Sequence, residues 1–141
     1  MERIKNIEIG LESRTKLLKG INKITNAVVT TLGPNGRNVI IGHSQGDLHI
    51  PQSTKDGVTV AKSIQLEDIE ENIGAQLVKQ ASIKTADAAG DGTTTSTLLA
   101  SSIYKKGLEA SKEPTVNLVD LKRGIDKATT KVIDTLEEVS K

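Results

Sequence analysis

Hydrophobic positions recur at helical spacing along most of the chain. The first stripe lies within residues 11–32 and has spacings of four, three, four and four between its members, which are Leu17, Ile21, Ile24, Val28 and Leu32. This spacing places them on one face of a helix. Gly33 and Pro34 follow at once, and these two residue types commonly end helices. The pattern therefore predicts a first helix from about Leu11 to Leu32.

Three further helices follow from the same kind of pattern. Residues 67–88 contain an i, i+4 row of apolar residues, namely Ile69, Ile73, Leu77 and Ala81. In residues 93–110 we expect the buried side to be lined by Leu98, Leu99, Ser102 and Ile103. A last helix should begin near Asn117, a good N-cap, and carry an apolar stripe of Leu121, Ile125, Ala128, Val132, Leu136 and Val139.

Strand signals are confined to short stretches. Ile7 and Ile9 alternate with polar residues and predict a short strand at the N-terminus. Residues 39–41 are β-branched, and Leu48 and Ile50 could return as their partner in a hairpin. The expected fold class is therefore mainly α, a bundle of long helices with a short N-terminal strand and a β-hairpin.

Composition narrows the class of protein. The 141 residues carry 19 basic and 18 acidic side chains, for a net charge of +1, whereas nucleic-acid binders are usually strongly basic. No apolar run approaches the roughly 20 residues of a membrane span, and no signal peptide is visible. We therefore expect a cytoplasmic protein that binds neither nucleic acid nor membrane. Tyr104 is the only aromatic residue, which suggests that the aliphatic core packs against further polypeptide or other subunits.

The polar turn over residues 90–95 carries the strongest chemical signal. It reads Gly90-Asp91-Gly92-Thr93-Thr94-Thr95, between two predicted helices. Glycines allow close backbone approach to a ligand, and the free N–H groups of a helix start favour an anion such as phosphate. Because Asp91 would repel a bare phosphate, it suggests a bridging cation such as Mg²⁺. The alternative is a helix–loop–helix corner with a capping aspartate.

Two other polar turns accompany it. The first, Thr31-Leu32-Gly33-Pro34, taken alone favours a helix C-cap followed by a turn over a binding site. The second, Thr54-Lys55-Asp56-Gly57, contains adjacent opposite charges. Lys55 and Asp56 could form an exposed charge pair, or Lys55 could bind phosphate beside a carboxylate that positions water.

Together with residues 121–128, these three turns closely resemble the bacterial-type (group I, GroEL-like) chaperonins. The resemblance extends over essentially the whole chain, in order and with similar spacing, and residues 36–39 and 55–60 look like the bacterial type. It implies that the 141 residues correspond to the N-terminal part of the equatorial, ATP-binding domain.

The resemblance also implies roles for individual residues. Thr31, Leu32, Gly33 and Pro34 would line the nucleotide near its ribose and phosphates, and Lys55 would lie beside the phosphates. Asp91 would hold Mg²⁺, with K⁺ a further candidate ion, while the phosphate oxygens would be wrapped by Gly92, Thr93, Thr94 and Thr95. Asp56 would be the catalytic residue that helps organise the attacking water.

Two functions follow as expectations. The first is a subunit of an ATP-dependent protein-folding chaperonin, whose N-terminal strand and hairpin pair with neighbours in a homo-oligomeric ring. The second is a short chaperonin-like protein that docks on such a ring without catalysis of its own. The resemblance places the regions that bind unfolded clients and a co-chaperonin outside these 141 residues, together with the opposite wall of the nucleotide pocket. We therefore expect the chain alone to be inactive as an ATPase.

Overall fold

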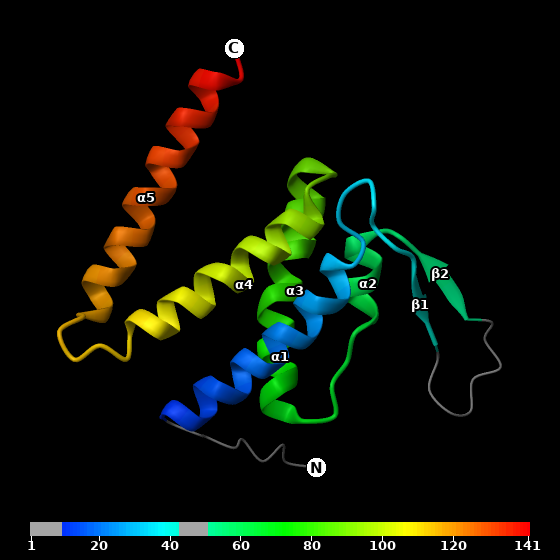
Figure 1. The fold of residues 1–141 in the computed structure, drawn as a ribbon, viewed down its shortest axis with the longest axis horizontal. Helices are drawn as coiled ribbons and strands as arrows, with labels where there is room; N and C mark the ends of the chain where they lie inside the picture. Colours follow the sequence, from blue (N-terminus) through cyan, green and yellow to red (C-terminus); the bar gives the residue numbers. More distant parts are fainter. Residues whose placement is uncertain (1–9, 43–50) are drawn as a thin grey trace. The chain divides into compact units, whose positions relative to one another are not determined.

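The structure is a computed structural model and describes residues 10–42 and 51–141. Those residues form five helices and one two-stranded antiparallel sheet (Figure 1). In chain order the elements are α1 (Leu11–Val29), β1 (Val39–Ile41), β2 (Gln52–Thr54), α2 (Gly57–Ser63), α3 (Ile69–Ala89), α4 (Thr93–Ala110) and α5 (Leu118–Val139). The mainly α fold class is confirmed. The chain divides into two compact units, one ending at Tyr104 and one beginning at Lys105.

The helix boundaries follow local capping chemistry. Asp56, Asp68 and Asn117 each accept a backbone N–H bond at the start of α2, α3 and α5, so the N-cap predicted at Asn117 is confirmed. The first helix is shorter than predicted and ends at Val29. Beyond that point the N–H groups of Thr31 and Leu32 bond to carbonyls three residues back, which tightens the chain into turns before Gly33 is reached.

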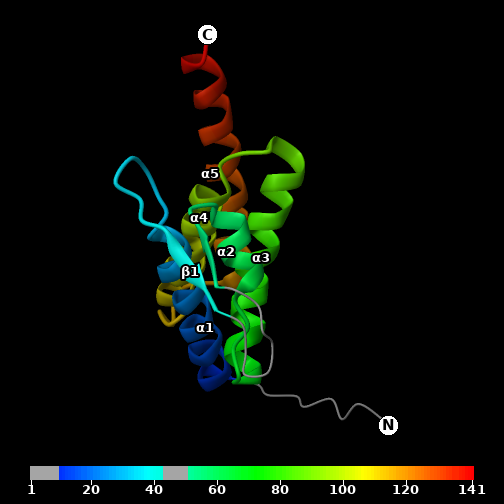
Figure 2. The ribbon, with the colours of Figure 1, turned by 90° about the vertical axis from the view of Figure 1, so that its right-hand side faces the viewer.

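The core of the first unit lies between α1, α2 and α3. Ile21, Ile24 and Val28 of α1 are at most 1% exposed, which confirms the centre of the predicted stripe. They form one cluster with residues of α2 and α3, namely Val60, Ala61, Ala75 and Val78. Helices α1 and α3 lie side by side in both views of the molecule (Figures 1 and 2).

Two glycines allow α1 and α3 to approach closely. A Cβ at Gly20 would collide with the backbone carbonyl of Glu71, and a Cβ at Gly74 would collide with that of Leu17. These two positions therefore let the helix backbones touch, where any side chain would hold them apart.

The predicted buried faces of α3 and α4 are wrong, because both helices turn small side chains toward the core. The row Ile69, Ile73 and Leu77 is about half exposed or more, because α3 turns a face of small side chains toward the core: Gly74, Ala75, Val78 and Ser82. In α4 the buried residues include Thr97 and Ser101, whereas the predicted Leu99 and Ile103 are 56% and 49% exposed. Hydrophobicity alone therefore misidentified both faces.

The predicted hairpin exists, and in the described residues its second strand begins at Gln52. Val39 pairs with Thr54 and Ile41 with Gln52, so the returning strand is the polar segment Gln52–Thr54. The predicted partners Leu48 and Ile50 lie outside the described residues, as does the expected strand at Ile7 and Ile9.

Helix α5, within the second unit, is strongly amphipathic, yet none of its residues is buried. Its apolar stripe matches the predicted one, with Val132, Leu136 and Val139 all more than half exposed. None of the helices in residues 10–42 and 51–141 is long and apolar enough to cross a membrane.

Candidate nucleotide site

The turn after α1 meets the start of α4. The hydroxyl oxygen of Thr31 lies 3.4 Å from that of Thr94, although 63 residues separate them in the sequence. Thr31 is 6% exposed, and its hydroxyl also donates to the carbonyl of Val28 at 2.7 Å. The buried Thr31 at the end of α1 therefore lies next to the first turn of α4.

The start of α2 joins the same place through Gly57. This glycine is buried, and a Cβ built on it would collide with Oγ1 of Thr94 and lie 3.4 Å from Oγ1 of Thr93. No larger residue fits at position 57 without displacing Thr94. The structure thus brings together the three polar turns identified in the sequence, through Thr31, Gly57, Thr93 and Thr94.

Left-handed glycines shape the loop that leads into α4. Gly90 and Gly92 have φ values of 71° and 78°, a region that side chains other than glycine rarely adopt. Between them Asp91 is exposed, and its Oδ1 accepts the N–H of Gly92 at 2.6 Å. Asp91 therefore lies in a tight turn between two glycines with positive φ.

At the start of α4, the hydroxyls of residues 96 and 97 bond within the helix, whereas the N–H groups of residues 93–95 do not. Ser96 and Thr97 donate their hydroxyls to the carbonyl of Thr93 at 2.9 and 2.8 Å. The first intrahelical bond is donated by Ser96 to Gly92, so the N–H groups of residues 93–95 precede the ladder and have no partner within it. Those N–H groups and the helix dipole make this end of α4 attractive to an anion.

The turn after α1 is compact. The N–H of Gly36 donates to Gly33 at 3.0 Å and that of Arg37 donates to Thr30 at 2.7 Å. A Cβ at Gly36 would collide with the carbonyl of Thr31. Leu32, Gly33 and Pro34 are exposed on this turn, where a ligand could reach them.

Asp56 is held by the helix that it caps. Its Oδ2 accepts the N–H of Thr59 at 2.9 Å and also the Thr59 hydroxyl, while Oδ1 accepts the N–H of Val58 at 3.4 Å. The Thr59 hydroxyl bond is the main reason that the pKa of Asp56 is lowered from its ordinary value. Lys55 is exposed next to it. The sequence analysis does not identify Thr59, which lies three residues after the capping Asp56.

The acidic residues of the site do not form a metal cluster by themselves. Residues 10–42 and 51–141 contain no group of three or more His, Cys, Asp or Glu side chains that could hold an ion. Mg²⁺ at phosphate sites typically takes only one or two carboxylates and completes its shell with phosphate oxygens and water. A single exposed Asp91 is consistent with that chemistry.

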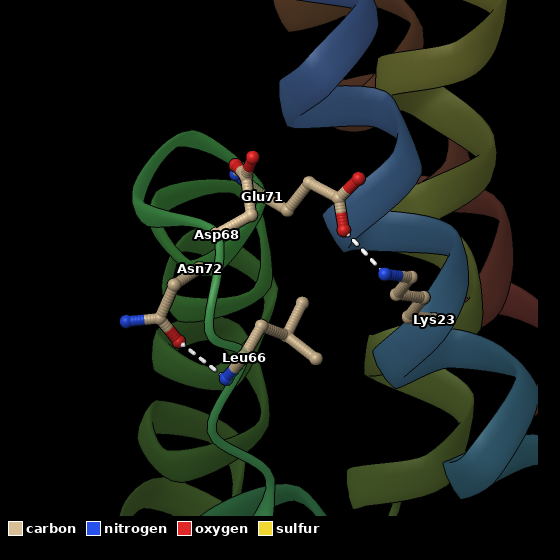
Figure 3. A network of polar contacts seen from close by, with 5 residues as sticks. All are labelled: Lys23, Leu66, Asp68, Glu71 and Asn72. Atoms are coloured by element: carbon tan, nitrogen blue, oxygen red, sulfur yellow. Dashed lines mark hydrogen bonds and ion pairs between the residues drawn. The ribbon is translucent and has the colours of Figure 1, made fainter.

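A polar network fixes the start of α3 relative to α1 (Figure 3). Lys23 donates to Glu71 across the two helices, and this hydrogen bond raises the pKa of Lys23. Asn72 accepts the N–H of Leu66 at 3.1 Å, and Asp68 accepts that of Glu71 at 2.9 Å. Of these contacts, the pair of Lys23 and Glu71 joins α1 to α3, near the end of α3 that is opposite to the turn of Asp91.

The chain belongs to the TCP-1/cpn60 chaperonin family, whose profile matches residues 24–141. It is also similar to the chaperonin gp146 from the bacteriophage EL 2 (Pseudomonas aeruginosa), crystallised in the presence of ATP-BeFx. The identity to that protein is 29% over 92% of this chain, with TM-scores of 0.73 and 0.72 for its two crystal forms. The match extends over 22% of the phage chaperonin, so this chain spans about a fifth of that relative's length. The chaperonin resemblance and the equatorial-domain-like fold expected from the sequence are confirmed.

Proposed function

We propose that residues 1–141 are the N-terminal segment of a chaperonin equatorial domain, which binds Mg-ATP and makes contacts within a ring of subunits. The observation that carries this proposal is the meeting of Thr31, Gly57 and Thr94. Three turns with phosphate-binding character are separated widely in sequence, yet they come together at the N-terminal end of α4.

In this proposal, the first turn of α4 binds the phosphates. The N–H groups and hydroxyls of Thr93, Thr94 and Thr95 supply neutral donors, and Gly92 allows the backbone to approach. The turn Thr31–Pro34 lies against the nucleotide near its ribose and phosphates. Lys55 adds a positive charge near the phosphates.

The two aspartates have separate tasks. Asp91 would hold Mg²⁺, which neutralises the phosphate charge, and its exposure leaves the carboxylate accessible. Asp56 would orient the water near the terminal phosphate, since a carboxylate with a lowered pKa stays ionised and accepts a hydrogen bond from water. Hydrolysis at such a site depends mostly on positioning and charge neutralisation.

Folding activity belongs to a larger assembly. The partners that we propose for a full chaperonin are the other subunits of a homo-oligomeric ring, unfolded client proteins and a co-chaperonin. This chain matches only 22% of the length of the phage chaperonin. We therefore expect the 141-residue chain to bind Mg-ATP weakly and to turn it over negligibly.

Isothermal titration calorimetry of the 141-residue chain with ATP tests the proposal, with and without Mg²⁺. The wild type should bind ATP more tightly when Mg²⁺ is present. Asp91→Asn should remove that Mg²⁺ dependence and weaken Mg-ATP binding at least about tenfold. Asp87→Asn provides the matched control, because Asp87 is an exposed aspartate only four residues away on α3.

The proposal requires the two aspartates to differ. Equal Mg-ATP affinity in Asp91→Asn and the wild type would contradict the assigned metal ligand. No detectable binding of Mg-ATP by the wild type, in a chain shown to be helical by circular dichroism, would contradict nucleotide binding by this segment.

A further inference from the structure

Within this proposed site the two oxygens of the Asp56 carboxylate are bound unequally. Oδ2 receives two hydrogen bonds from Thr59, one from its N–H and one from its hydroxyl. Oδ1 receives the N–H of Val58 at 3.4 Å, longer than the usual 2.7–3.2 Å for such a bond. Since each carboxylate oxygen has two lone pairs, Oδ1 keeps the greater capacity to accept a further donor.

The hydroxyl bond goes beyond what helix capping needs. The Asp56 carboxylate already caps α2 by accepting the backbone N–H groups of Val58 and Thr59. On the same helix, Ser63 donates its hydroxyl to the carbonyl of Val60 at 2.8 Å, as hydroxyls in helices commonly do. Thr59 instead directs its hydroxyl at the carboxylate. Its side chain therefore fixes the rotation of the Asp56 carboxylate.

The carboxylate is also anchored through its neighbours. The N–H of Asp56 donates to Oγ1 of Thr54 at 3.1 Å. On its other side Gly57 is buried against Thr94. Asp56 thus adjoins the place where α2 meets the first turn of α4, and Thr59 determines how its carboxylate is presented there.

We infer that Thr59 is a positioning residue: it holds Oδ2 of Asp56 and leaves Oδ1 to accept a hydrogen bond from a water at the terminal phosphate of the nucleotide. This inference rests on the proposed function, because it takes Asp56 to lie near that phosphate. A substitution at Thr59 should therefore change the behaviour of the Asp56 carboxyl as well as the stability of α2.

The test uses NMR of the 141-residue chain to follow the Asp56 carboxyl carbon. The variants are Thr59→Val, which keeps the shape and removes the hydroxyl, Thr59→Ser, which keeps the hydroxyl, and Ser63→Ala as the control on the same helix. Thr59→Val should raise the pKa of Asp56, because the hydroxyl bond favours the ionised form. Thr59→Ser and Ser63→Ala should leave that pKa near the wild-type value. Lys62, whose charge lowers the same pKa, is present in every variant.

The second readout is the response of that resonance to saturating Mg-ATP. The wild type and Thr59→Ser should show the same shift, and Thr59→Val should lose at least half of it. An unchanged pKa and an unchanged response in Thr59→Val would overturn the positioning role. If no variant binds Mg-ATP although Thr59→Val raises the pKa, the proposed function fails, and Thr59 is a capping residue only.

Discussion

Replacing Gly74 by alanine should separate α1 from α3. The added Cβ would collide with the carbonyl of Leu17, with the Leu17 carbonyl carbon and Cα at 2.8 and 2.9 Å. The carbonyl oxygen, carbonyl carbon and Cα of Leu17 are all backbone atoms of α1, so no side-chain rotation can relieve the collision. The two helices would have to move apart along the face that contains the core cluster.

The size of the effect follows from two opposing terms. Overpacking a well-packed core by one methyl group costs about 1–3 kcal/mol, and a collision with rigid backbone belongs near the upper end of that range. Alanine in place of glycine gains about 1 kcal/mol in helix propensity. The free energy of unfolding should therefore fall by about 2 kcal/mol.

Urea denaturation followed by circular dichroism measures this loss. Gly124→Ala is the matched control, since Gly124 is also within a helix but a Cβ there would meet nothing within 4 Å. The control should be neutral or stabilising by up to about 1 kcal/mol. Gly20→Ala, at the same crossing, should resemble Gly74→Ala, and the double variant should lose less than the sum, because one separation relieves both contacts. The reasoning is refuted if Gly74→Ala is as stable as Gly124→Ala.

Two further variants test local capping. Asp56→Ala should destabilise α2 by about 1 kcal/mol. Because the pKa of Asp56 is lowered in the folded state, this difference from wild type should be present above about pH 4 and disappear as the pH falls through the lowered pKa; urea midpoints at pH 6, 4 and 2 would show it, and a pH-independent difference would contradict it. Lys79→Met should cost about 1 kcal/mol, since Lys79 donates to the carbonyls of Lys62 and Ile64 at 2.7 and 3.3 Å at the end of α2. The exposed Lys84→Met is its control, and equal unfolding midpoints for these two lysine variants would refute the capping role.

The sequence predicts best where large aliphatic residues make the contacts. The buried face of α1 could be predicted because Ile21, Ile24 and Val28 are both its most hydrophobic and its most buried residues. The buried face of α3 could not, because close helix packing selects small residues such as Gly74 and Ser82, which carry little hydrophobic signal. The segment Gln52–Thr54 was not predicted as a strand for a related reason: it is polar and largely exposed, so only backbone pairing identifies it as one.

The candidate site could also be predicted only in part. Its three turns could be found from their residue types and from the chaperonin resemblance. Their contacts could not, because the fit of Gly57 against Thr94 depends on the packing of helices that are distant in sequence. The hydroxyl bond from Thr59 to Asp56 joins residues only three apart, yet Thr59 was not identified from the sequence. The individual roles of Asp56 and Asp91 stay predictions until they are tested by substitution.

The single tyrosine has a practical consequence for experiments. Tyr104 is the only aromatic residue of the chain, and its ring packs against the aliphatic cluster of the first unit. Ultraviolet emission from the unlabelled protein therefore arises from one known position on α4. Partial burial raises the pKa of the Tyr104 phenol, so alkaline absorbance titration and emission both report whether α4 remains docked on the core. The nucleotide binding that we propose at the start of this helix can then be tested through Tyr104, without introducing a dye.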